Sequence, residues 1–74
     1  MCKLRNLVKD SVYYYRTQRG LTQLELAELV DMDKGAISEI ERGLVSPKLE
    51  TLEKIAAALK IEPHLLLMPT PKEQ

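Results

Sequence analysis

The sequence has no tryptophan and no phenylalanine, and three tyrosines are its only aromatic residues. Its hydrophobic core must therefore be aliphatic. The single cysteine, Cys2, excludes an internal disulfide, whereas a small extracellular domain usually carries several. The sequence also lacks the run of about 18 apolar residues that a transmembrane helix needs, and the apolar segment of a signal peptide. We therefore expect a cytoplasmic protein that does not span a membrane.

Residues for catalysis and metal binding are equally scarce. His64 is the only histidine, and no cysteine, aspartate or second histidine stands at ligand spacing from it. The three glycines stand apart from one another and form no phosphate-binding loop. We therefore expect neither enzymatic activity, nor a metal site, nor a cofactor.

Length and charge also limit the size of the fold and the kinds of partner that the protein can have. With 74 residues, 45% of them apolar and 30% charged, the chain is long enough for one small folded domain. Its 11 basic and 11 acidic residues cancel, so it has no overall basic excess of the kind that nucleic-acid-binding proteins normally show. The charges are segregated, however: residues 1–19 are strongly basic and residues 20–60 are net acidic. In so small a domain, apolar burial and chain entropy nearly cancel, which favours packing against a second copy.

The spacing of apolar residues predicts an all-α fold of five helices. Leu4, Val8, Val12 and Tyr15 form the stripe of a first helix over about residues 5–19. Thr22 and Glu25 are spaced as a capping box, which predicts a second helix that ends near Asp31. Further helices are expected over about residues 34–42, 49–60 and 63–68, which gives a domain over residues 1–68 and a flexible tail over residues 69–74.

The second and third helices have the features of a helix-turn-helix motif, in which a tight turn sets two short helices at a steep angle. The small Ala27 stands where the third helix would cross the second, and Ile37 and Ile40 supply apolar anchors. Asp31 takes the turn position that requires tolerance of a positive φ, where glycine would be better. Asp33 has the side chain of a good N-cap for the third helix.

These linked features resemble the lambda-repressor and Cro-type helix-turn-helix family over about residues 8–67. The resemblance rests on a set of matching positions: Arg16, Gly20, Leu21, Thr22, Gln23, Leu26, Ala27, Ile37, Ser38, Glu41, Arg42, Gly43, Pro47, Leu52, Ile55 and Ala56. It implies a transcriptional regulator, with repression the expected effect, whose third helix lies in the major groove of double-stranded DNA. It also implies a homodimer on a pseudo-palindromic operator.

The resemblance assigns roles to individual residues. Its base-reading positions are the outward residues of the third helix, Lys34, Gly35, Ser38 and Glu39. Lysine can donate to guanine, glutamate can accept from cytosine, serine serves a base or a phosphate, and glycine reads nothing. Its phosphate-binding candidates are Thr22, Gln23, Arg42 and Lys48. For each position the alternative is an ordinary capped turn or a solvated surface charge. Arg16 and Glu41 match a buried structural ion pair.

Two further surfaces have open interpretations. Basic residues near the N-terminus form either a DNA-binding arm or the solvated face of the first helix: Lys3, Arg5, Lys9 and Arg19. The apolar run at residues 65–68 exceeds what one short helix can bury, so we assign Leu65, Leu67 and Met68 to a dimer interface. Together with Leu24, the same surplus also fits a protein-interaction module, such as an antitoxin that captures a toxin.

Overall fold

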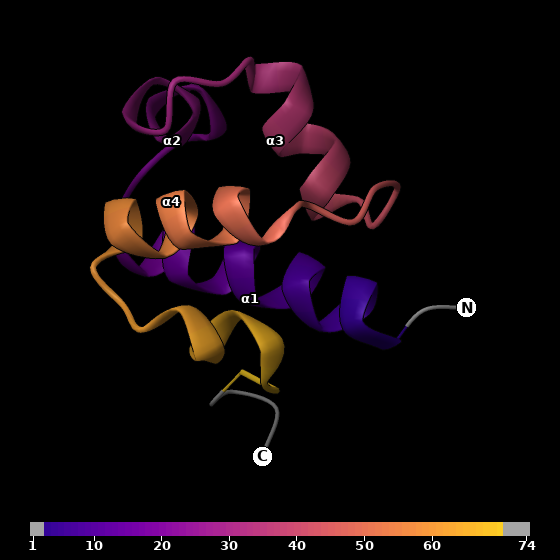
Figure 1. The fold of residues 1–74 in the computed structure, drawn as a ribbon. Coiled ribbons are helices and arrows are strands. Elements are labelled where there is room, and N and C mark those ends of the chain that lie inside the picture. Colours follow the sequence, from indigo (N-terminus) through magenta and orange to yellow (C-terminus); the bar gives the residue numbers. More distant parts are fainter. Residues whose placement is uncertain (1–2, 71–74) are drawn as a thin grey trace.

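The computed structural model describes residues 3–70, and Figure 1 shows their arrangement. Within this part of the chain there are four α-helices and one 3-10 helix, in the order α1 (Lys3–Gln18), α2 (Gln23–Leu29), α3 (Lys34–Glu41), α4 (Leu49–Leu59) and η1 (Pro63–Leu67). The all-α class is as predicted. Cys2 and residues 71–74 of the predicted tail lie outside the described residues, as do the side chains of Lys3, Leu4 and Arg5.

The fifth element differs from the prediction, because it is a 3-10 helix and not an α-helix. Pro63 opens it and Pro69 follows closely, so there is little room for a hydrogen-bonded α-helical turn. Instead the N–H of Leu65 donates to the carbonyl of Glu62 at 3.0 Å, a bond to the third residue back. The short element still places the Leu66 side chain in the interior, where it is fully buried.

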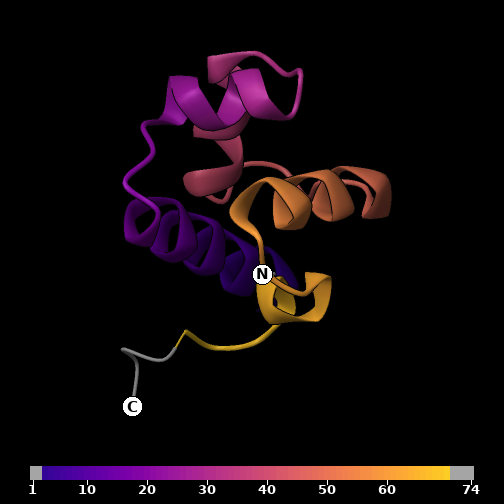
Figure 2. The ribbon, with the colours of Figure 1, turned by 90° about the vertical axis from the view of Figure 1, so that its left-hand side faces the viewer.

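The helices form two groups around one aliphatic core. Figures 1 and 2 place α2 and α3 together at one end of the molecule, with α1, α4 and η1 at the other. Twelve side chains are buried between them: Val8, Val12, Leu26, Ala27, Val30, Ile37, Ile40, Leu52, Ile55, Ala56, Leu59 and Leu66. Tyr15, the aromatic residue on the predicted stripe, packs against the edge of this core. No helix of the described residues is long and apolar enough to cross a membrane.

Local hydrogen bonds fix the helix-turn-helix. The capping box is present: the N–H of Glu25 donates to Thr22 Oγ1 at 3.0 Å, and the N–H of Thr22 donates to Glu25 Oε1 at 2.8 Å. At the turn, Asp31 adopts the left-handed φ of 58° that the motif requires. Asp33 occupies the N-cap position of α3, but its side chain makes no capping hydrogen bond, contrary to the sequence prediction.

Candidate nucleic-acid interface

The outward face of α3 is free of the rest of the described chain. Ile37 and Ile40 on its inner face are buried, whereas Lys34 and Glu39 are exposed and Ser38 is half-buried. Apart from its chain neighbours and the backbone of its own helix, a Cβ placed on Gly35 would meet no atom within 4 Å, so its outward side is open. The four predicted base-reading residues therefore lie together on a surface that a ligand can reach.

The angle of α3 depends on close contact with α2. Ala27 is fully buried between the two helices, and its carbonyl accepts a hydrogen bond of 2.8 Å from the N–H of Met32 just past the turn. A larger side chain at Ala27 would push α3 away from α2, because a packed interior has no spare volume. The small residue thus sets how far the outward face of α3 projects.

A buried ion pair joins α1 to the end of α3. Arg16 Nε donates to Glu41 Oε2 at 2.6 Å and Arg16 Nη2 donates to Glu41 Oε1 at 3.0 Å. The two side chains are only 11% and 5% exposed. The remaining nitrogen, Arg16 Nη1, donates to the carbonyl of Leu21 at 2.7 Å, directly before the capped start of α2. One guanidinium therefore ties together α1, the chain before α2 and α3.

The predicted phosphate-binding residues lie at the ends of three helices. Thr22 and Gln23 are at the start of α2, where the Thr22 hydroxyl acts as the cap and the Gln23 amide contacts Glu41. Arg42 follows α3 directly, and Lys48 precedes α4. Both cationic side chains are exposed, and neither forms a hydrogen bond or ion pair with another described residue.

The structure does not support a basic arm that includes Arg19. Its Nε donates to the carbonyl of Leu59 at 2.6 Å and its Nη2 donates to the carbonyl of Lys60 at 3.1 Å. A cation at the C-terminal end of a helix satisfies free carbonyls and offsets the negative end of the dipole, so Arg19 caps α4. Lys9 pairs with Asp10 at 2.9 Å. The side chains of Lys3 and Arg5 lie outside the described part.

The apolar run at the C-terminal end is divided between core and surface. Leu66 is fully buried and Leu65 is half-buried, whereas Leu67 and Met68 are 37% and 46% exposed. The monomer therefore uses Leu66 for its own core and leaves Leu67 and Met68 at the surface. Leu24 is also exposed, at 50%.

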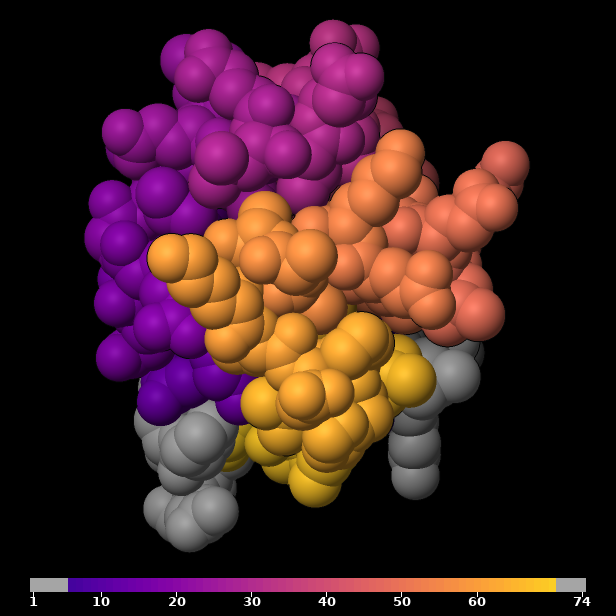
Figure 3. Space-filling model, turned by 60° about the vertical axis from the view of Figure 1, so that its left-hand side comes forward, coloured from indigo at the N-terminus to yellow at the C-terminus, as the bar shows by residue number. Residues whose placement is uncertain are grey.

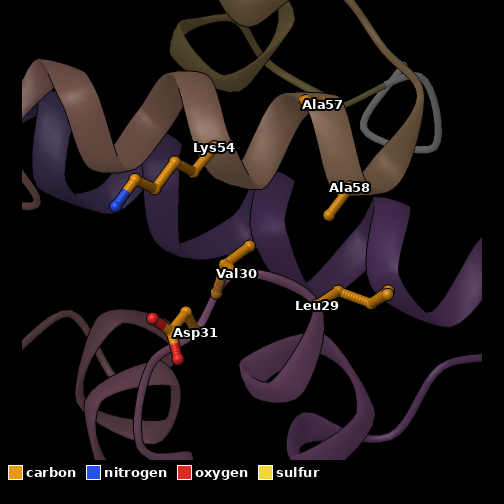
Figure 4. A pocket seen from close by; sticks show the side chains of 6 residues that line it. All are labelled: Leu29, Val30, Asp31, Lys54, Ala57 and Ala58. Carbon is orange, nitrogen blue, oxygen red and sulfur yellow. The ribbon is translucent and has the colours of Figure 1, made fainter.

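A shallow hollow of about 470 Å³ separates the turn after α2 from α4 (Figure 4). Its lining residues are Leu29, Val30, Asp31, Lys54, Ala57 and Ala58. The hollow forms because the alanine side chains of α4 are too small to fill it. Leu29, beside the hollow, is 60% exposed. Figure 3 shows the surface on which α4, in orange, lies beneath the magenta α2. This hollow contains none of the predicted DNA contacts.

Among the described residues, no group of three or more His, Cys, Asp or Glu side chains is placed to hold a metal ion.

Two side-chain hydrogen bonds were not anticipated from the sequence. Ser11 is fully buried on α1 and its hydroxyl donates to the carbonyl of Met68 at 3.0 Å. The Gln23 amide donates from Nε2 to Glu41 Oε1 at 3.0 Å. A serine in the middle of an apolar stripe is a weak sign of such a bond. No sequence signal pairs Gln23 with Glu41, because the two residues stand on different helices.

Comparison with known proteins gives consistent matches. A family model of helix-turn-helix proteins, HTH_3, matches residues 12–66. The HTH-type transcriptional regulator SinR of Bacillus subtilis is 36% identical over 62 residues, which are 82% of this chain and 56% of that protein. The immunity repressor of Bacillus phage phi105 is 43% identical over 47 residues, 64% of this chain and 33% of that protein. The chain thus spans little more than half the length of SinR.

Solved structures agree with the fold. A crystal structure of a hypothetical transcription factor from Neisseria superposes with a TM-score of 0.87 at 34% identity, covering 95% of this chain and 79% of that one. The restriction-modification controller protein C.AhdI from Aeromonas hydrophila superposes with a TM-score of 0.77 at 36% identity, covering 80% of this chain and 86% of that one.

Proposed function

Because the chain belongs to the HTH_3 helix-turn-helix family, we propose that it is a sequence-specific regulator of transcription that binds double-stranded DNA. The observation that carries the proposal is the free outward face of α3, with Lys34, Gly35 and Glu39 exposed above the buried Ile37 and Ile40. A helix anchored in this way fits the major groove, which is about 12 Å wide. The name of the immunity repressor of Bacillus phage phi105 favours repression.

In the proposed mechanism, different residues contact the bases and the phosphates. Lys34 donates to guanine, and Glu39 accepts from the amino group of cytosine, so that these two side chains choose the sequence. Gln23 at the start of α2 and Arg42 directly after α3 bind phosphates and fix the register of α3 along the groove. No step of this mechanism forms or breaks a covalent bond. The expected place of action is the cytoplasm.

The active form is a homodimer in this proposal. Leu67 and Met68 are exposed, and Leu65 is half-buried next to them, which provides an apolar surface for a second copy. Two copies related by a two-fold axis would place their α3 helices in successive major grooves, with half-site centres about 34 to 36 Å apart. The operator should therefore be pseudo-palindromic.

Selection from a random duplex library would identify the operator, and fluorescence anisotropy would then measure affinity for operator and random duplexes. Lys34→Ala should lose discrimination at one base pair by about 1 to 3 kcal/mol, whereas Arg42→Ala should weaken binding to every duplex alike. Lys54→Ala is the matched control, because Lys54 is an exposed helical lysine of α4 that lines the hollow between α4 and the turn after α2. Equal losses of operator and random binding for Lys34→Ala would refute the base-reading role.

Salt dependence separates DNA binding from the protein-interaction alternative. Binding to a duplex falls steeply between about 50 and 200 mM salt, because phosphate contacts release counterions. Capture of a toxin or other protein through Leu24 or through Leu67 and Met68 would depend mainly on apolar contact. A chain that shifts no duplex at 50 mM salt would contradict the proposed function.

A further inference from the structure

The amide of Gln23 is held by the buried ion pair. Gln23 is the first residue of α2, and its Nε2 donates to Glu41 Oε1 at 3.0 Å. The same oxygen accepts Arg16 Nη2 at 3.0 Å, and the other oxygen of Glu41 accepts Arg16 Nε at 2.6 Å. The glutamine therefore extends a network whose two charged members are almost fully buried.

The chemistry of these groups fixes which end of the amide is anchored. A glutamine amide has an oxygen that only accepts and a nitrogen that carries two donor hydrogens. Ionised Glu41 only accepts, so it holds the nitrogen end. One N–H of Gln23 Nε2 is used in this way, and the second makes no hydrogen bond to another described residue. Gln23 is only half-buried, so its second N–H remains available to a ligand.

We propose that the Arg16–Glu41 ion pair acts as a positioning device for phosphate binding, in addition to joining α1 to α3. It presents the second N–H of Gln23 to a DNA phosphate, which has only acceptor oxygens. An unanchored glutamine would present its oxygen or its nitrogen, and would lose side-chain freedom on binding. The inference rests on the proposed function, because the phosphate belongs to the bound duplex.

The same ion pair also ties together the chain segments that carry Gln23 and Arg42. Arg16 Nη1 holds the carbonyl of Leu21 at 2.7 Å, directly before the start of α2, while Glu41 is the last residue of α3 and precedes Arg42. Gln23, which contacts Glu41, and Arg42, which follows Glu41 in the chain, are therefore both next to residues that this ion pair holds. The start of α2 and the end of α3 are thus held together before DNA binds, which lowers the cost of ordering the backbone at the interface.

The first test uses the free protein and needs no DNA. In a 1H–15N NMR spectrum, the side-chain amide of Gln23 should show one proton that exchanges slowly and is shifted from the values of free glutamine. The control is Gln18, an exposed glutamine at the end of α1. Replacing Arg16→Met together with Glu41→Leu removes both charges without stranding one, and should return the Gln23 signals to those of Gln18. Wild-type Gln23 signals that already coincide with those of Gln18 would overturn the inference.

The second test is a double-mutant cycle on a random-sequence duplex at 50 mM salt, since phosphate contacts do not depend on sequence. Gln23→Ala should weaken binding about tenfold for each copy of the protein bound, as expected for loss of a hydrogen bond to a charged group. The Arg16→Met/Glu41→Leu variant should weaken binding by a similar factor, and should cause no further loss when combined with Gln23→Ala. Circular dichroism establishes that each variant is folded.

The outcomes distinguish this inference from the proposed function. The inference fails if the Arg16→Met/Glu41→Leu variant binds DNA as tightly as wild type. It also fails if this replacement weakens binding by the same factor in wild type and in Gln23→Ala, because the ion pair then does not act through Gln23. The proposed function then still stands. If wild-type protein binds no duplex, both are refuted. If the double variant does not fold, the wild-type NMR signals of Gln23 and Gln18 decide the matter.

Discussion

The Arg16–Glu41 ion pair allows a quantitative prediction about stability. Arg16→Met leaves the Glu41 carboxylate, only 5% exposed, with Gln23 as its remaining donor. Glu41→Leu leaves the Arg16 guanidinium, 11% exposed, with the carbonyl of Leu21 as its remaining partner. Stranding one charge of a buried pair costs about 3 to 5 kcal/mol of the free energy of unfolding.

This cost is a large share of the total. A domain of this size has a free energy of unfolding of about 4 to 11 kcal/mol, and each kilocalorie lost lowers Tm by about 4 to 8 °C. Each single variant should therefore melt at least about 12 °C below wild type. The double variant Arg16→Met/Glu41→Leu strands no charge and replaces the pair with apolar side chains. It should lose about 1 to 2 kcal/mol, mainly because the carbonyl of Leu21 loses its donor.

Urea denaturation followed by circular dichroism at 222 nm measures all four free energies under the same conditions. The expected order of stability is wild type, then the double variant, then the two single variants. A double variant whose loss equals the sum of the two single losses would show that the side chains contribute independently. Single losses below about 1 kcal/mol would show that water screens the pair, and either result would refute the reasoning.

Three further predictions concern the core and the helix ends. Leu66→Ala should lower the free energy of unfolding by about 2 to 5 kcal/mol in urea denaturation, because the side chain is fully buried, whereas Leu67→Ala should leave the monomer nearly unchanged. Lys60→Gly should raise the free energy of unfolding by about 0.5 to 1 kcal/mol, because Lys60 has a left-handed φ of 60° that glycine adopts without strain. The control, Lys54→Gly within α4, should instead lower the free energy of unfolding by about 1 kcal/mol. Thermal melts should therefore show shifts of opposite sign for the two variants. Ser11→Ala should lower the free energy of unfolding by about 1 kcal/mol, because the carbonyl of Met68 loses its donor, and hydrogen exchange near η1 should become faster.

The sequence was informative where structure depends on local pattern. The spacing of Leu26, Ala27, Ile37 and Ile40 predicted the inner faces of α2 and α3, and all four side chains are buried. The need for a residue that tolerates positive φ identified Asp31, and its φ of 58° agrees. Such features involve residues within one or two helical turns of one another, so apolar period and turn chemistry are enough to locate them.

Contacts between distant segments could not be predicted in this way. Arg19 bonds carbonyls 40 and 41 residues away, and Ser11 bonds a carbonyl 57 residues away. A side-chain donor that bonds to a backbone carbonyl leaves no pattern in the sequence, because every residue has such a carbonyl whatever its side chain. Charge alone therefore suggested a DNA-binding arm for Arg19, although its actual partner is the end of α4. The 3-10 geometry of η1 also escaped prediction, since apolar spacing over five residues does not distinguish it from an α-helix.

The empty space around Gly35 makes this surface unusually open to change. Its backbone has an ordinary negative φ, and a methyl group added there would touch nothing. Substitution by alanine would even favour the helix by about 1 kcal/mol, so folding places no demand for glycine at this site. A new side chain at that position could alter the preferred operator without a compensating repair elsewhere, which makes it a natural starting point for retargeting the protein to another DNA sequence.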